Sequence, residues 1–192
     1  MAFTVQEFRS QLRYDGARPN LFRVAMSFPS LSLSGSNGAN EKLTFMCRAA
    51  QLPGSTVNQI PINYYGREVK VWGNRTFQEW TLTIINDEDF LVRNAFEQWL
   101  SGGNSHAGNL RDPAFIQGDG GYQTDAKIYQ EGKTGNVIKT YNMIGCFPID
   151  LSPIEVDWGA NDAVEEFSVT LGYQWFESNT TDFTTNVSMI NP

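Results

Sequence analysis

The chain has 192 residues, of which 41% are hydrophobic, 13% aromatic and 18% charged, and its 21 acidic side chains outweigh 14 basic ones for a formal net charge of -7. This composition predicts a globular protein with its own core, and the acidic balance argues against nucleic acid as the primary ligand, because that affinity depends on neutralising phosphates. The first ten residues lack the regions of a signal peptide and no apolar run reaches the length of a membrane span, so we expect a protein made in the cytosol that binds no membrane by itself.

The N-terminal part of the chain is predicted to contain a short helix followed by two strands. Thr4 and Glu7 have the spacing of a capping box, which indicates a helix within residues 1–16. Residues 20–28 and 42–50 then alternate between apolar and polar side chains, as strands with one buried face do.

Residues 51–65, QLPGSTVNQIPINYY, differ from the strands around them. Two prolines and a glycine lie among apolar and aromatic residues. The segment is too apolar for a free loop and too rich in proline for a central strand. We interpret it as an extended arm that covers either its own core or a partner, and we expect strand character to resume over residues 67–72.

The stretch from residue 74 to residue 100 contains two periodicities in succession. Side chains alternate from Phe77 to Asn86, which indicates a strand with one buried face. From Asp87 onwards the spacing changes to three and four, which indicates an amphipathic helix. The residues that share this spacing are Phe90, Leu91, Asn94, Ala95, Gln98 and Trp99. We expect Asn86 to cap the helix and the three acidic residues after it to stabilise its positive N-terminus.

The C-terminal part is predicted to be mainly β. Residues 122–130 and 137–147 are predicted to form a hairpin, residues 148–158 an irregular crossover, and residues 164–176 the last strand. A polar tail follows over residues 178–192 and is expected to be loosely ordered.

Taken together, these elements predict a mainly β fold. Seven or eight strands would form two packed antiparallel sheets, arranged as a sandwich or a partial barrel, with one mid-chain α-helix and a short N-terminal helix. We expect a single domain over residues 1–177.

The sequence offers no convincing site for catalysis. His106 is the single histidine and lies in a glycine-rich loop, so it has no partner for a metal site of ordinary spacing. Cys47 and Cys146 fall inside predicted strands and are expected to be reduced core residues. The acidic clusters lack calcium-loop spacing, and no phosphate-binding motif is present. We therefore expect no catalytic residue, no metal and no cofactor, and we do not expect an enzyme.

Four segments, covering most of residues 17–177, carry a resemblance to a known family. They are ARPNLFRVAMSF at 17–28, FMCRAAQLPGSTVNQIPINYYGREVKVWGNRTF at 45–77, WTLTIINDED at 80–89 and IEVDWGANDAVEEFSVTLGYQWFE at 154–177. In this order they resemble the tail tube proteins of contractile-tailed bacteriophages. The long loop over residues 29–41 and the extended tail depart from the family pattern.

The resemblance implies a particular assembly. Strands of neighbouring subunits would join a shared β-barrel in a hexameric ring, rings would stack into a tube, and the helix would lie outside the barrel. It also implies a surrounding sheath protein, baseplate and tail-terminator proteins as partners, and DNA that leaves through the lumen without specific binding. The protein would be assembled in the host cytoplasm and reside in the virion. Barrel closure would remove exposed strand edges, and an acidic lumen would repel phosphate.

Two sets of residues become candidates under this hypothesis. The inter-ring candidates in the arm are Leu52, Pro53, Val57, Ile60, Pro61, Ile62, Tyr64 and Tyr65. The lumen candidates on polar strand faces are Glu79, Thr81, Thr83, Asp125 and Lys127.

Three other functions remain open from the sequence. A subunit of a type VI secretion or pyocin tube would share the fold, and a type VI tube, whose lumen handles proteins, would not need an acidic lumen. A monomeric β-sandwich binding module, for carbohydrate for example, would need a cluster of exposed aromatic residues on a stable monomer. A hydrolase would need a catalytic site that the sequence does not indicate.

Overall fold

The computed structural model describes residues 4–12, 14, 16–29, 38–116 and 121–181. Its strands are β1 (Phe22–Met26), β2 (Cys47–Ala50), β3 (Ser55–Tyr64), β4 (Arg67–Phe77), β5 (Trp80–Ile85), β6 (Thr124–Glu131), β7 (Val137–Leu151), β8 (Glu166–Gly172) and β9 (Trp175–Ser178). Its helices are α1 (Val5–Gln11), α2 (Ala39–Met46), α3 (Leu91–Gly103) and the 3-10 turn η2 (Pro113–Phe115). None of the described helices is long and apolar enough to span a membrane.

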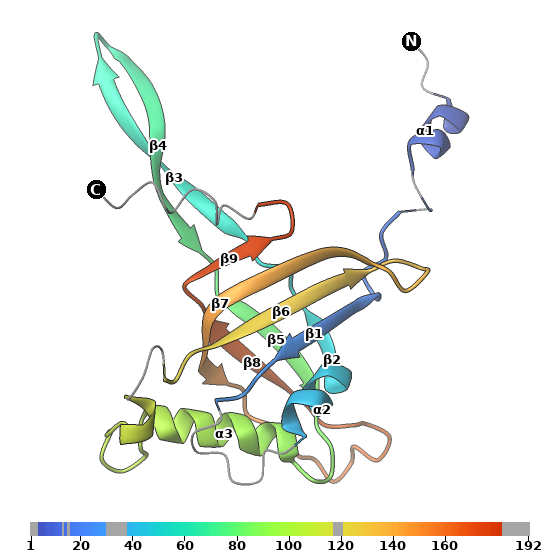
Figure 1. Cartoon of the computed structure of the whole chain (residues 1–192), viewed down its shortest axis with the longest axis vertical. Helices are drawn as coiled ribbons and strands as arrows, with labels where there is room; N and C mark the ends of the chain where they lie inside the picture. Colours follow the sequence, from blue (N-terminus) through green and yellow to red (C-terminus); the bar gives the residue numbers. More distant parts are fainter. Residues whose placement is uncertain (1–3, 13, 15, 30–37, 117–120, 182–192) are drawn as a thin grey trace.

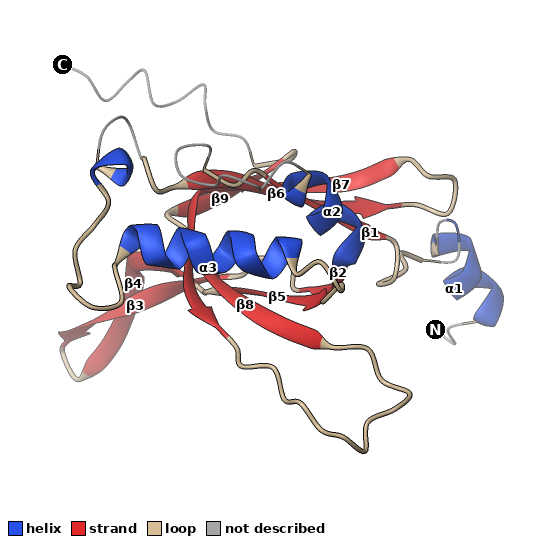
Figure 2. Cartoon of the chain, turned by 90° about the horizontal axis from the view of Figure 1, so that it is seen from below, coloured by secondary structure: helices blue, strands red, loops and turns tan. Residues whose placement is uncertain are grey.

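The strands form a seven-stranded antiparallel sheet and a separate two-stranded one. The large sheet has the order β1-β6-β7-β8-β5-β2, and β9 also pairs with β7. The first part of β7 pairs with β6 and β9, and its last part pairs with β8. The sheet therefore folds at β7 into two layers, which Figure 2 shows above and below α3. This confirms the mainly β prediction, and the described sheet does not close into a barrel.

A glycine permits the bend in β7. Gly145 has φ +68°, a left-handed conformation that side chains with a Cβ rarely adopt. Its N–H donates to the Asp125 carboxylate at 3.1 Å, which holds the bend against β6. A Cβ at Gly145 would lie 2.9 Å from Cγ of Gln174. Both the backbone angle and the space thus require glycine here.

The core lies between the two layers and under α3. The side chains of Trp80, Leu82 and Ile84 alternate into it from β5, as the sequence predicts. From α3, which lies across one end of the layers (Figure 1), the buried side chains are Val92, Ala95, Phe96 and Trp99. Burying each large apolar side chain stabilises the fold by about 1.5–3 kcal/mol relative to leaving it exposed.

The start of α3 differs from the sequence prediction. The helix begins at Leu91, and its N-cap is Phe90 in a left-handed conformation. Asn86 does not cap it, because its side-chain amide donates to the Glu165 carboxylate at 3.0 Å. The buried stripe is also shifted, since Phe90 is partly exposed while Phe96, absent from the predicted stripe, is fully buried.

The predicted strand over residues 42–50 is wrong in its first half. Residues up to Met46 form α2, and only Cys47–Ala50 form β2. Ala39 and Leu43 are both buried, at the spacing of one helical turn, so α2 gains core contacts that a strand would not make. Of the long loop over residues 29–41, residues 30–37 lie outside the described residues.

The C-terminal region is β-rich as predicted, but the limits of its strands differ from the prediction. The hairpin β6–β7 is confirmed, but β7 continues through Pro148 to Leu151, into the expected crossover. The expected last strand is two strands, β8 and β9, which pair with different parts of β7. Of the expected tail, residues 182–192 lie outside the described residues.

The N-terminal helix is confirmed as α1, with its capping box. The Glu7 N–H donates to the Thr4 hydroxyl at 3.3 Å, and the Thr4 N–H donates to the Glu7 carboxylate at 3.1 Å. Hydrogen bonds from the Thr4 backbone N–H and from the Thr4 side chain to the Glu7 carboxylate lower the pKa of Glu7. None of the residues of α1 is buried.

Candidate assembly surface

The predicted arm is one strand of a long β-hairpin. β3 pairs with β4 from Ser55↔Phe77 to Tyr64↔Arg67, and neither strand pairs with another described strand. Tyr65 and Gly66 form the two-residue turn, both with positive φ (47° and 76°), which is the geometry that matches the twist of a tight hairpin. The hairpin projects from one end of the molecule, away from α3 (Figure 1).

One face of the hairpin is apolar and uncovered. Cross-strand partners lie on the same face, and Ile60 opposes Val71 while Ile62 opposes Val69. These four side chains are 39–52% exposed. Pro61, opposite Lys70, lies on the other face. The hairpin therefore presents an exposed apolar face that contact with another surface would cover.

A bulge separates this outer part of the hairpin from its base. The register shifts between Val57 and Gln59, where two residues of β4, Gly73 and Asn74, oppose one of β3. A Cβ at Gly73 would lie 2.9 Å from the backbone oxygen of Asn58. The close approach of the two backbones therefore requires glycine at this bulge.

The base of the hairpin is fixed to the body. The Trp80 indole N–H donates to the Gln51 carbonyl at 2.7 Å, and the Gln78 N–H donates to the Gly54 carbonyl at 3.3 Å. The Phe77 ring lies 5.6 Å from the ring of Phe176, edge to face. These contacts anchor the two chain segments that lead into and out of the hairpin.

The inter-ring candidates are thus divided among three places. Ile60 and Ile62 lie on the apolar face, and Tyr64 and Tyr65 lie near the tip with their rings 4.5 Å apart. Leu52 and Pro53 precede β3 at the base, Val57 lies below the bulge, and Pro61 is on the opposite face.

The sequence interpretation predicted a strand over residues 67–72, which is confirmed as part of β4, but did not assign this strand to the surface. Val69 and Val71 complete the apolar face, and the exposed Trp72 lies on the opposite face beside Gln59. The available signal was the pair of alternating segments separated by Tyr65–Gly66, which is a hairpin pattern without the usual Asn-Gly turn.

The lumen candidates do not lie together. Thr81 and Thr83 are on the outward face of β5, opposite Thr170 and Ser168 of β8, and Glu79 is exposed just before β5. Asp125 and Lys127 are exposed on β6, which belongs to the other layer.

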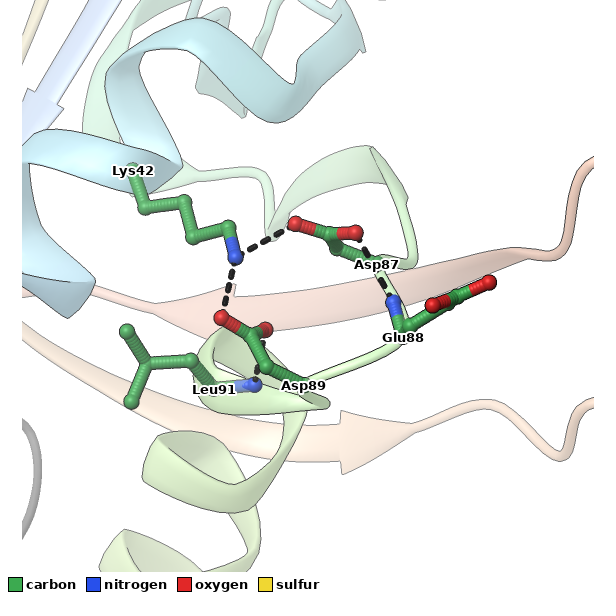
Figure 3. A network of polar contacts seen from close by, with 5 residues as sticks. All are labelled: Lys42, Asp87, Glu88, Asp89 and Leu91. Atoms are coloured by element: carbon green, nitrogen blue, oxygen red, sulfur yellow. Dashed lines mark hydrogen bonds and ion pairs between the residues drawn. The ribbon is translucent and has the colours of Figure 1, made fainter.

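The acidic run before α3 forms an ion-pair network with α2 (Figure 3). Lys42 contacts both Asp87 and Asp89, and the Leu91 N–H donates to Asp89 at 3.0 Å. The hydrogen bonds with Asp87 and Asp89 raise the pKa of Lys42, and those with Lys42 lower the pKa of each aspartate. The acidic run thus links α2 to α3 and accepts a hydrogen bond from the N–H of the first residue of α3. The described residues contain no group of three or more candidate metal ligands.

Neither cysteine has the properties of a nucleophile. Cys146 is fully buried in β7 and Cys47 is partly buried at the start of β2, and both are free thiols. Burial raises the pKa of each thiol to about 12, so the reactive thiolate is scarce at neutral pH. His106 is exposed in the loop after α3.

Comparisons with known proteins agree with this geometry. Residues 17–179 match the family model described as phage tail tube protein. The chain is 32% identical over 164 residues to tail tube protein gp19 of Enterobacteria phage T4, covering 85% of this chain and 92% of that protein. It is 24% identical over 175 residues to a tail tube protein of Serratia phage KSP90, covering 88% and 94%.

Solved structures share the fold. A chain in the baseplate of the anti-feeding prophage superposes with a TM-score of 0.60 at 12% identity, covering 84% of this chain and 94% of that one. A chain in the extended sheath–tube complex of an extracellular contractile injection system, PVC, superposes with a TM-score of 0.54 at 15% identity, covering 92% and 98%.

Proposed function

Because the chain belongs to the phage tail tube protein family, as a structural subunit of a contractile tail and not an enzyme, we propose that its copies close into hexameric rings that stack into a hollow tube. The observation that supports this proposal best is the β3–β4 hairpin, whose apolar face is exposed and whose strands pair with no other described strand. A soluble monomer rarely leaves such a face open. Stacked copies would bury it at every contact along a tube.

Ring closure is supported by the open edges of the large sheet. In the described residues β1, β2 and β9 are edge strands of this sheet, each paired on one side only. Unpaired edges attract other strands, and joining them across subunits into a shared barrel removes them.

We propose that the layer containing β5 faces the lumen. The hairpin continues this layer, because only residues 51–54 separate β2 from β3 and residues 78–79 separate β4 from β5. Thr81 and Thr83 on its outward face carry hydroxyl groups, and Arg48 is paired with Glu166. Such a face offers phosphate little positive charge, so DNA would cross the lumen without specific binding. Glu79 would add negative charge, whereas Asp125 and Lys127 would face away from the lumen.

Thiol labelling tests the lumen assignment, with Thr83→Cys and Lys127→Cys as a matched pair. In assembled tubes a small reagent should modify both cysteines, while a bulky polymer maleimide should modify only the one at Lys127. In free subunits the bulky reagent should modify both. Equal bulky labelling of the two variants in intact tubes would contradict a luminal β5.

The partners implied by the family are the sheath, the baseplate and the tail-terminator protein, and we propose that this tube contacts all three. The protein is a component of the virion tail, and we propose that it assembles in the host cytoplasm. The family assignment favours a phage tube over a type VI secretion or pyocin tube. A binding module is not favoured, because the exposed Trp72 lies on β4 and the exposed Trp158 lies on the loop between β7 and β8. These two segments are at opposite ends of the molecule (Figure 1), so the two side chains form no shared platform.

Shortening the hairpin tests the proposed function. Replacing residues 60–71 with Asn-Gly keeps the Gln59–Trp72 pair and closes it with a favoured turn. The variant should remain folded by circular dichroism and should not form tubes in negative-stain electron micrographs, whereas the unaltered protein should form rings or tubes. Normal tubes from the shortened variant would refute the role of the hairpin, and a persistent monomer of the unaltered protein at high concentration would refute the tube itself.

A further inference from the structure

A second uncovered apolar surface lies in the loop between β7 and β8. In residues 153–165, Trp158 is 100% exposed, Val156 79% and Val164 69%. Large apolar side chains at these exposures gain nothing from the subunit's own core. A cluster of them on one loop is typical of an interaction site.

The loop is held in place despite this exposure. At its start, the Arg93 guanidinium donates to the Ser152 carbonyl at 3.2 Å. At its end, the Asn86 N–H donates to the Glu165 carbonyl at 2.8 Å. Near its tip, the Gly159 N–H donates to the Asp157 carboxylate at 3.0 Å. A loop that is anchored to the body at both ends and contains a hydrogen-bonded local turn loses less conformational entropy on docking than a free loop does.

The charges of the loop and of the hairpin are complementary. Residues 153–165 contain four acidic side chains and no basic one. The hairpin, residues 55–77, contains three basic side chains and one acidic one. Arg67 lies on the same face as Val69 and Val71, because alternate residues of a strand share a face.

The two surfaces lie at opposite ends of the molecule. In Figure 1 the hairpin extends upwards from the layers, while the loop before β8 lies below them beside the start of α3. Figure 2 shows the same separation from below. The hairpin and the loop of one chain therefore cannot meet. The hairpin of one copy can instead contact the loop of the next copy, head to tail, and such a contact can be repeated along a filament.

We propose that the 153–165 loop of one copy docks on the apolar face of the β3–β4 hairpin of another copy. Trp158 is the apolar anchor, and Glu155 and Asp162 face the positive charge of Arg67. This contact rests on the proposed tube function and specifies which surface of the neighbouring ring receives the hairpin.

A charge-swap experiment on the full chain tests the pairing. Arg67→Glu and Glu155→Lys should each raise the critical concentration for tube formation, and Arg67→Glu combined with Glu155→Lys in one chain should restore it, because exchanged charges regain attraction. Trp158→Ala should raise that concentration by about tenfold or more, since buried tryptophans dominate interface energies. The thermal midpoint of the free subunit should not change in any variant, because these side chains are exposed.

A disulfide trap provides an independent measurement. The variant with Ile62→Cys and Trp158→Cys should give a ladder of covalently linked subunits when tubes are oxidised, and either substitution alone should not. Tubes that form at the unaltered concentration from Trp158→Ala and Glu155→Lys, or oxidised tubes without a ladder, would overturn the pairing. If the pairing is wrong but the proposed tube function is correct, the hairpin variants would still fail to assemble. The failure of the pairing can therefore be distinguished from the failure of the proposed function.

Discussion

The apolar face of the hairpin yields a quantitative prediction. Replacing Ile60, Ile62, Val69 and Val71 with threonine keeps β-branched side chains, which favour strands, but removes most of the apolar area. About half of each side chain is exposed in the subunit. If docking covers that half, each contributes about 1 kcal/mol, because full burial of such a side chain is worth about 1.5–3 kcal/mol. The fourfold variant should then lose about 3 kcal/mol for each hairpin docked, allowing for the methyl group that threonine retains.

This loss is large enough to measure by assembly. Since about 1.4 kcal/mol corresponds to tenfold, the critical concentration for tubes should rise by roughly 100-fold, which sedimentation of polymer from subunit can follow. The stability of the body should change little, because β3 and β4 pair only with each other among the described strands.

A control on the other face of the same hairpin separates docking from folding. Gln59 and Asn63 lie opposite Trp72 and Glu68, on the face that lacks the aliphatic stripe. Threonine at both positions should leave the critical concentration within about threefold of that of the unaltered protein. If the fourfold variant assembles as readily as this control, the apolar face is not buried in the tube and the reasoning fails.

Three further predictions concern the subunit. Gly145→Ala should destabilise it by about 2 kcal/mol in urea unfolding, because alanine is strained at this positive φ and its Cβ meets a neighbouring side chain; unchanged stability would contradict the role of the bend. Lys42→Met should lower the thermal midpoint at pH 7, where the two paired aspartates, whose pKa values are lowered, are ionised. The difference should shrink once the pH falls below about 4, the ordinary pKa of aspartate, and disappear at still lower pH, where the folded subunit also protonates them. A difference that persists there would show that packing, not charge, is lost. Cys47 and Cys146, whose pKa values are raised to about 12, should resist thiol reagents at pH 8 in the native state and react in urea, and fast native labelling would contradict their burial.

Periodicity in the sequence predicts the elements in which buried and exposed side chains repeat at a regular spacing. β5 alternates between core and surface along its whole length, and β8 alternates up to Leu171, so periodicity indicated both strands. α2 was missed because Leu43, Phe45 and Cys47 also fit a strand period, although Phe45 is exposed in the helix. The start of α3 was misplaced because the acidic residues before it bind Lys42, a residue distant in sequence.

The candidate assembly surface is predicted from the sequence only in part. The composition of residues 51–65 correctly indicated an unusual apolar segment, but the proline and the Tyr65–Gly66 turn hid its pairing with β4. Pro61 is tolerated because the hairpin has two edges, and a strand with a free edge does not need every N–H. Which side chains share a face depends on the cross-strand register, and that register was not visible in one strand alone.

The long strand β7 has a mechanical consequence for the subunit. It spans both layers and is bonded along its 15 residues to β6, β9 and β8. In antiparallel ladders the hydrogen bonds lie perpendicular to the strands. A pull along β7 therefore loads many of these bonds in shear at once, so they must break together and not one after another. Because this one strand continues through both layers, a force applied along it is shared between them, and the two layers resist that force as a single unit.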